Sequence, residues 1–181
     1  VGPGFYNKAI DLQEDATAQW ANVESSYQRR ADLIPNIVKT AQGYADFEQE
    51  TLVKVIEARS KATSITIDPS NITPAQLEQF QQAQQGLTSA LSRLLAVFER
   101  YPDLKANENF KELINELERT ENRINVERNR FNEAVKPFNK HLKSFPNNII
   151  NNFIGNFEEM GYFEADQGTE NAPDVEFDFG N

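Results

Sequence analysis

The amino-acid sequence predicts an all-α protein, an elongated antiparallel four-helix bundle followed by an irregular acidic C-terminal tail. Apolar residues recur at spacings of three and four from Phe5 to about Phe145, the spacing that places side chains on one face of a helix. The predicted helices have similar lengths and short connections, and both features favour an up-down-up-down bundle. With 181 residues the chain has the size of a single domain.

The first predicted helix begins near Phe5 and ends before Pro35. Its apolar stripe consists of Ala9, Leu12, Ala16, Trp20, Val23 and Tyr27. Proline lacks an amide donor and disfavours helical geometry in the residue before it, so Pro35 marks either a turn or a kink. We expect the turn, because two helices of ordinary length agree better with typical helix lengths than one very long helix does. The alternative is one kinked helix through Pro35, which gives an elongated bundle of three helices.

The second predicted helix starts at Pro35, since proline suits the first helical position, and fades in the β-branched stretch before Pro69. The third starts at Pro74, where Thr73-Pro74-Ala75-Gln76 forms a capping box, and ends before Pro102. Its seam alternates spacings of three and four throughout and comprises Leu77, Phe80, Gln84, Leu87, Leu91, Leu94, Phe98 and Tyr101. Such a seam is typical of a helix packed lengthwise against its neighbours.

The fourth predicted helix begins near Asn107, a suitable N-cap residue, and Pro137 is expected to kink or end it. Its seam comprises Phe110, Leu113, Leu117, Thr120, Ile124, Glu127, Phe131, Ala134 and Phe138. A short apolar piece follows from Ile149 to Phe157. We therefore divide the chain into residues 1–4, a trimmed end or cloning remnant, residues 5–157, the helical bundle, and residues 158–181, the acidic tail.

The net charge of −10 is concentrated in the tail, because residues 158–181 hold eight acidic residues and no Lys or Arg. Subtracting these eight from 28 leaves 20 acidic against 18 basic residues in residues 1–157, a net charge of −2. Binding to nucleic acid or to anionic lipid requires a basic face, so this distribution argues against both. No apolar run approaches the roughly 20 residues that span a bilayer.

The sequence offers no recognisable set of catalytic residues. There is no cysteine and a single histidine, His141, which excludes thiol chemistry and the paired Glu-x-x-His motifs of di-iron bundles. The eight glycines form neither a phosphate loop nor a nucleophile elbow. The carboxylates of the fourth helix alternate with arginines, which is typical of salt-bridged helix faces. We therefore expect no enzymatic activity, no metal and no cofactor.

Several charged residues look placed rather than incidental, and those that face inward are expected to be paired. Arg30 and Asp32 precede Pro35, while Glu48, Arg59 and Glu127 continue the heptad rhythm of their helices. A charge removed from water is costly unless it is paired, so these residues are expected to pair across helices and to fix the register of the bundle. The alternative is a polar ligand site between helices near Arg59, Glu127 and Arg128.

The tail carries a second candidate site. Val175, Phe177 and Phe179 alternate with two acidic residues, a strand-like pattern that can add to the sheet edge of a partner. The same residues could instead dock on their own bundle, or the tail could stay disordered as its composition favours. All three alternatives remain open at this level.

Several recognisable motifs follow one another along the chain. The first is the stretch of twelve consecutive residues from Tyr27 to Val38, Tyr-Gln-Arg-Arg-Ala-Asp-Leu-Ile-Pro-Asn-Ile-Val. Later motifs follow in order: Gly43-Tyr44-Ala45, Glu57-Ala58-Arg59, Thr120-Glu121-Asn122-Arg123-Ile124, Phe131-Asn132-Glu133-Ala134-Val135, Ser144-Phe145-Pro146-Asn147-Asn148 and Gly161-Tyr162-Phe163. Together these motifs resemble the LemA family, and the resemblance covers nearly the whole chain. It implies a bacterial helical bundle behind a single N-terminal membrane helix, with no established enzymatic activity and no catalytic residues.

The resemblance also completes the set of polar residues expected to be structural. These are Arg30, Asp32, Asn36, Glu48, Arg59, Glu121, Asn122, Arg123, Glu127, Arg128 and Asn132. It implies a single-pass protein of the bacterial cell membrane whose membrane helix is missing here, and the sequence favours neither side of the membrane. The leading hypothesis is a tethered interaction or scaffold module with an unknown protein partner and no nucleic acid, monomeric as the present fragment. The alternative is a sensor that binds a small ligand or ion between the helices.

Overall fold

The computed structural model describes residues 2–44, 46–144 and 146–164. Its helices are α1 (Gly2–Gln42), α2 (Gln49–Ser64), α3 (Pro74–Phe98), α4 (Pro102–Lys105), α5 (Glu108–Lys143) and α6 (Asn147–Ile150), and a π-helical turn, η1 (Asn151–Gly155), continues α6. No strand occurs within these ranges. The all-α prediction is therefore confirmed, and the N-caps predicted at Thr73 and Asn107 accept bonds from the amides of Gln76 and Phe110.

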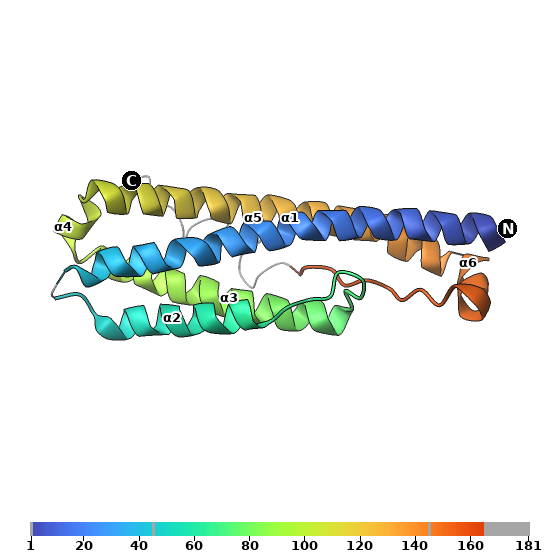
Figure 1. Ribbon diagram of the computed structural model, residues 1–181, viewed down its shortest axis with the longest axis horizontal. Coiled ribbons are helices and arrows are strands. Elements are labelled where there is room, and N and C mark those ends of the chain that lie inside the picture. The colour runs from blue at the N-terminus through green and yellow to red at the C-terminus, as the bar shows by residue number, and fades with distance from the viewer. Residues whose placement is uncertain (1, 45, 145, 165–181) are drawn as a thin grey trace.

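The bundle is elongated because two of its helices are much longer than the other two. α1 and α5 run antiparallel along the whole length of the molecule, and the shorter antiparallel pair α2 and α3 lies beside only one half of them (Figure 1). At 1.5 Å per residue the 41 residues of α1 span roughly 60 Å, against roughly 24 Å for the 16 residues of α2. The predicted antiparallel four-helix bundle is confirmed, with unequal helices.

The turn predicted at Pro35 is wrong. α1 passes through Pro35 and ends at Gln42, and the chain reverses at Gly43 and Tyr44, whose amides bond to the carbonyls of Thr40 and Ala41. α2 accordingly begins at Gln49 and not at Pro35. Helical packing outweighs the local preference, since Ile34, Ile37 and Val38 are buried on the same side of α1. α5 likewise continues through Pro137 to Lys143.

The interior contains two hydrophobic clusters separated by a buried polar layer. One cluster takes its residues from Ile34 onward in α1, from Leu87 onward in α3 and up to Leu117 in α5. The other includes Tyr27, Phe80 and Ile124 on the same three helices, and extends to the N-terminal end of α1. Between the two clusters lie the buried polar residues Arg30, Gln84, Thr120 and Glu121. The apolar seams of α1, α3 and α5 are thus interrupted by polar residues at the same level along the bundle.

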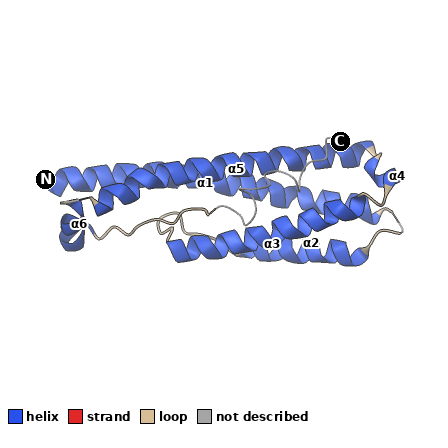
Figure 2. Cartoon of the chain, turned by 180° about the vertical axis from the view of Figure 1, so that it is seen from behind, coloured by secondary structure: helices blue, strands red, loops and turns tan. Residues whose placement is uncertain are grey.

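The half of the α1–α5 pair that α2 and α3 leave uncovered is covered by a non-helical segment. After Asn156, which adopts a left-handed conformation with φ of 54°, residues 157–164 run back along the bundle beside the loop between α2 and α3 (Figures 1 and 2). Met160 and Phe163 are each only 5 % exposed. Residues 158–164, the start of the predicted tail, thus complete the second cluster, while Val175, Phe177 and Phe179 lie outside the described residues.

Candidate functional site

Arg30 is the centre of the buried polar layer. Its guanidinium is 1 % exposed and donates to both carboxylate oxygens of Glu121, at 3.1 and 3.3 Å. It also donates to the carbonyl and the side-chain oxygen of Gln84, at 3.1 and 2.8 Å, and to the hydroxyl of Thr88, at 2.8 Å. One side chain of α1 therefore bonds to α3 and α5 together. Because the planar guanidinium has fixed donor directions, this pattern specifies the register of three helices.

Arg59 forms a hydrogen bond that helps to explain how α1 continues through Pro35. The carbonyl of Ala31 lies four residues before Pro35 and would ordinarily accept a bond from the amide that proline lacks. Arg59 reaches from α2 and donates its Nε–H to this carbonyl at 2.7 Å. Ala31 is buried, so its carbonyl would otherwise lack a partner inside the protein. A side chain thus replaces the missing backbone hydrogen bond.

Arg59→Leu is expected to destabilise the fold by roughly 1–3 kcal/mol, because it leaves a buried carbonyl without a hydrogen bond. In a Pro35→Ala background the cost should fall, since the new amide of residue 35 supplies that bond. Urea unfolding of the two single variants and the double variant measures this coupling. Lys61→Leu, an exposed change on the same helix, serves as the control. An equal cost of Arg59→Leu in both backgrounds would contradict the explanation.

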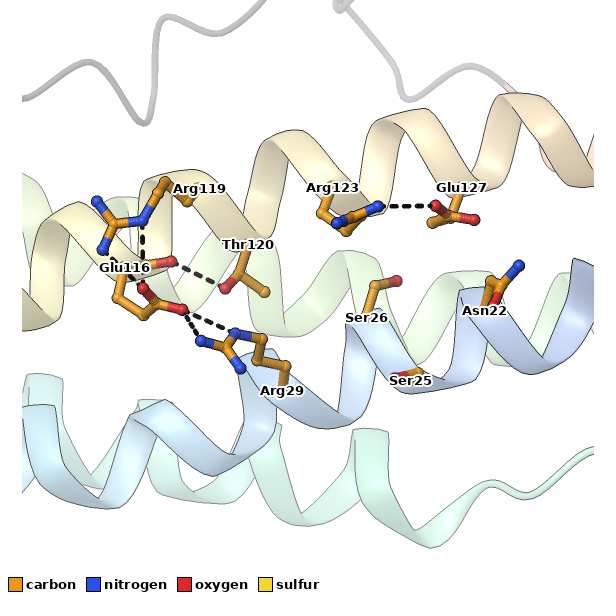
Figure 3. A pocket seen from close by; sticks show the side chains of 9 residues that line it. All are labelled: Asn22, Ser25, Ser26, Arg29, Glu116, Arg119, Thr120, Arg123 and Glu127. Atoms are coloured by element: carbon orange, nitrogen blue, oxygen red, sulfur yellow. Dashed lines mark hydrogen bonds and ion pairs between the residues drawn. The ribbon is translucent and has the colours of Figure 1, made fainter.

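A polar groove of about 600 Å³ lies between α1 and α5 (Figure 3). Three arginines, Arg29, Arg119 and Arg123, face it together with hydroxyl side chains that include Ser26 and Thr120. The hydroxyls are used locally, because Ser26 donates to the carbonyl of Val23 at 2.7 Å and Thr120 to that of Glu116 at 2.8 Å. The arginines are the groups of this groove that could bind an added anion.

Two carboxylates organise the arginines of the groove. Glu116 accepts from Arg29, with Nε at 2.7 Å, and from Arg119, with Nη2 at 2.7 Å. Glu127 is buried and accepts from Gln19 of α1 at 2.5 Å and, at 3.4 and 3.3 Å, from Arg123 and Arg130. The hydrogen bonds from Arg119 and then Arg29 lower the pKa of Glu116 below its ordinary value of 4.5.

The lowered pKa of Glu116 gives a pH-dependent contribution to stability. A carboxyl whose pKa is lower in the folded than in the unfolded state stabilises the fold above its ordinary value of 4.5, and this contribution is lost as the pH falls through the lower, folded-state pKa. Glu116→Gln should therefore be less stable than the parent at pH 7 and should approach it in acid. Unfolding at several pH values measures the difference. Glu112→Gln, an exposed change on the same helix, is the control for the loss of one carboxylate.

The remaining predicted residues fall into two groups. Asn132 and Arg128 hold the segment 157–164, since Asn132 bonds to the backbone of Phe163, and Arg128 donates to the carbonyl of Glu164 at 2.7 Å and lies over the ring of Phe163. The other group is exposed and comprises Asp32, Asn36, Glu48 and Asn122. Asp32 and Glu48 therefore do not face inward. Asp32 accepts from Gln28 one turn earlier, and Glu48 pairs with Arg100, which follows α3, at 3.9 Å.

The alternative ligand site near Arg59, Glu127 and Arg128 is not assembled. Arg59 bonds to the backbone of α1, Glu127 faces Gln19, and Arg128 contacts the docked segment. Of the three, only Glu127 lines the groove between α1 and α5. The three residues therefore do not form one ligand site, and the groove between α1 and α5 includes only Glu127 of the three.

Sequence reasoning missed the partners of these charges. Gln84 and Thr120 occupy seam positions where an apolar residue is the rule, and this deviation was the available signal for a buried polar layer. Gln19, Gln81 and Asn139 carry no comparable signal, because an amide in a helix is ordinarily exposed. Their hydrogen bonds are made to residues distant in the sequence, Gln19 to Glu127 and the other two to the segment 157–164, and the local pattern does not predict those contacts.

Nowhere in the described ranges do three or more His, Cys, Asp or Glu side chains gather in a way that could hold a metal ion. His141 stacks on Phe5, with ring centroids 4.9 Å apart, and its ring nitrogens lie 3.0 Å from the carbonyl oxygen of Phe5 and 3.2 Å from the amide of Asn147. These contacts join the end of α5 to the start of α1 and give His141 a structural role.

The fold and its polar contacts define an elongated helical-bundle protein in which the charged interior orders the helices and a returning segment completes the core. The chain belongs to the LemA family, whose model matches residues 19–177. Within the described residues no helix is both long enough and apolar enough to cross a bilayer.

Curated relatives include proteins of two different descriptions. The chain is 26 % identical to magnetosome protein MamQ 2 of Paramagnetospirillum magneticum over 178 residues, covering 88 % of this chain and 64 % of that protein. It is 25 % identical to magnetosome protein MamQ of Magnetospirillum gryphiswaldense, covering 87 % and 64 %. Protein LemA of Metamycoplasma hominis is 27 % identical over 147 residues, covering 81 % and 64 %. None of these names denotes an enzyme, and this chain spans 64 % of each relative's length.

Proposed function

We propose that this chain is the non-enzymatic interaction domain of a bacterial protein tethered to a membrane by a helix outside the present sequence. The observation that carries the proposal is that amide side chains of α3, α5 and η1 bind an extended segment of backbone, the chain's own residues 157–164, and the surface that holds this segment is called the groove below. Membership of the LemA family and the names of the relatives agree with a role outside enzymology. The charged interior supports this proposal as well, because its buried groups serve to hold helices together.

The tether is tested by fractionating cells that produce the whole protein of which this chain is a part. The proposal expects the protein in the membrane fraction after washing with high salt and with alkaline carbonate, which release proteins held only by surface contacts. A protein recovered in the wash would contradict the tether. The present chain produced alone is the matched control and is expected in the wash.

A second candidate function is a sensor, and the groove between α1 and α5 is the observation that favours it. Three arginines face a space large enough for a small molecule, so the ligand would carry an anionic group. Inorganic phosphate and citrate are suitable first probes in a thermal-shift titration, since a ligand that binds only the folded state raises the melting temperature. Arg123→Ala should abolish the shift and Arg93→Ala, an exposed change on α3, should keep it. A flat titration would count against the sensor.

A further inference from the structure

Four amide side chains each bind one residue of the returning segment twice, donating to its carbonyl and accepting from its amide. Asn151 does so with Phe157, both bonds at 2.8 Å, and Asn139 with Met160, at 3.0 and 2.9 Å. Asn132 does so with Phe163, both at 2.8 Å, and Gln81 with Glu164, at 2.6 and 3.1 Å. We call these four residues the amide clamps. Each makes the pair of bonds that a neighbouring β-strand would make with an extended chain.

The spacing of the clamps matches an extended peptide. Asn132 and Asn139 lie seven residues apart on α5, or about 10.5 Å at 1.5 Å per residue. The residues they bind, Phe163 and Met160, lie three apart, or about 10 Å at 3.3–3.4 Å per residue. Two turns of α5 and three residues of the extended segment therefore have nearly the same length. Because the segment is antiparallel to α5, successive clamps engage it without a change in direction.

The groove also selects side chains. Met160 and Phe163 are buried, and the ring of Phe163 lies 5.9 Å from that of Trp20 and 5.7 Å from that of Phe131. Gly161 lies against α3, where an added Cβ would come within 3.0 Å of the Cα of Pro74 and 3.1 Å of the Cβ of Leu77. Tyr162 points away and is 42 % exposed. The groove thus accepts the sequence Met-Gly-x-Phe in an extended conformation.

We propose that the amide-clamp groove is a peptide-recognition site and that, in an assembly, it binds residues 157–164 of a second copy of this chain. The fit to Gly161, Met160 and Phe163 shows that the chain's own segment matches this groove, and every copy carries that segment. Exchange of an identical element is a low-cost route to a dimer, since the contacts are those already made within one copy. This inference rests on the proposed function, because a membrane tether raises the local concentration of other copies and therefore the fraction of chains that exchange segments, relative to the same chain free in solution.

Two complementary variants test the exchange directly. Gly161→Val keeps the groove but carries a segment that no longer fits. The double variant Asn132→Leu with Asn139→Leu keeps the segment but loses two clamps. Each variant alone should sediment as a monomer. In an equimolar mixture the intact groove of one and the intact segment of the other should associate without competition, and the dimer fraction should exceed that of either variant alone by about tenfold.

A mixture that sediments as the sum of its two components would overturn the proposal, provided that both variants keep the helical circular dichroism and the cooperative melt of the parent. If either variant fails to fold, crosslinking of full chains that carry one introduced cysteine each tests the exchange instead. The natural chain contains no cysteine, so only the introduced ones react. Lys143 and Glu159 form an ion pair across α5 and the segment, at 3.4 Å. Lys143→Cys and Glu159→Cys chains are mixed, held by N-terminal hexahistidine tags on phosphatidylcholine vesicles containing nickel-chelating lipid, and treated with a short bis-maleimide.

Exchange predicts crosslinks between the two chains that exceed those of a control pair, Glu57→Cys with Lys143→Cys, by about tenfold, the gain expected of a second, intramolecular contact. Crosslinks no more frequent than in the control pair would overturn the proposal. Because the vesicles supply the tether artificially, this result does not depend on whether the natural protein is anchored in a membrane. A fractionation that fails to find the natural protein in membranes would overturn the proposed tether and leave the exchange result standing.

Discussion

Arg30→Met is expected to lower the free energy of unfolding by roughly 3–5 kcal/mol, the largest single effect of a charge in this protein. Removal of the guanidinium takes away the ion pair that the buried carboxylate of Glu121 makes with Arg30 and the hydrogen bond that Arg30 donates to the side-chain oxygen of Gln84. An uncompensated buried charge is far more costly than the loss of an exposed pair. Urea unfolding followed by circular dichroism at 222 nm measures the change.

Two further variants decide whether burial of the charge is the reason. Arg30→Met combined with Glu121→Leu removes both charges and should recover most of the loss, since an apolar pair of similar volume replaces the ion pair. Arg29→Ala removes the neighbouring arginine, whose side chain is 63 % exposed, and should cost at most about 1 kcal/mol. A double variant as unstable as Arg30→Met would show that the helices depend on this arginine for a reason other than its charge.

Phe163→Ala is expected to cost roughly 3–5 kcal/mol, the range for removing a fully buried aromatic ring. The ring contacts Trp20, Phe131 and Phe80, and the guanidinium of Arg128 lies 5.0 Å from its centre. Its loss opens a cavity in the second cluster and weakens the docking of residues 157–164. Trp20 is the single tryptophan of the chain and lies beside the cavity, so its fluorescence reports the change directly.

Tyr162→Ala is the matched control for Phe163→Ala, because it removes an aromatic ring from the adjacent, exposed position. It should change the stability by no more than about 0.5 kcal/mol, as surface substitutions generally do. Hydrogen exchange should then show faster exchange of the Met160 and Phe163 amides in the Phe163→Ala variant and unchanged exchange in the control. Equal costs for the two variants would mean that the segment does not belong to the core.

The helical fold was predictable because its signal is repeated. Leu87, Leu91, Leu94 and Phe98 follow one another at alternating spacings of four and three, so a seam is recognised even where one position deviates. The turn predicted at Pro35 was wrong because it relied on the local preference of proline alone. Buried residues on both sides of Pro35, Ile34 and Ile37 among them, keep the helix continuous. The compensating donor, Arg59, comes from another helix and leaves no mark in the sequence around Pro35.

The candidate site was predictable only in part, and the reason is geometric. Glu127 lies in a seam and was expected to face inward, as it does. The orientation of Asp32 and Glu48 was left open and both are exposed, since proximity to a turn or a shared spacing does not determine which face of a helix a residue occupies. Asn139 and Gln81 gain their roles from a segment that returns more than twenty residues later or more than eighty residues away, and periodicity within one helix carries no information about that return.

The most direct test of the proposed interaction domain is site-specific photo-crosslinking in living bacteria that produce the whole protein. A photoreactive phenylalanine analogue placed at Tyr162, on the exposed side of the docked segment, is compared with one at Glu57 on α2. The proposal predicts a specific crosslinked protein from position 162 that disappears when Asn132 and Asn139 are both changed to leucine, and no such product from position 57. Absence of a specific product at position 162, or one that persists without the two clamps, would contradict an interaction made through this groove.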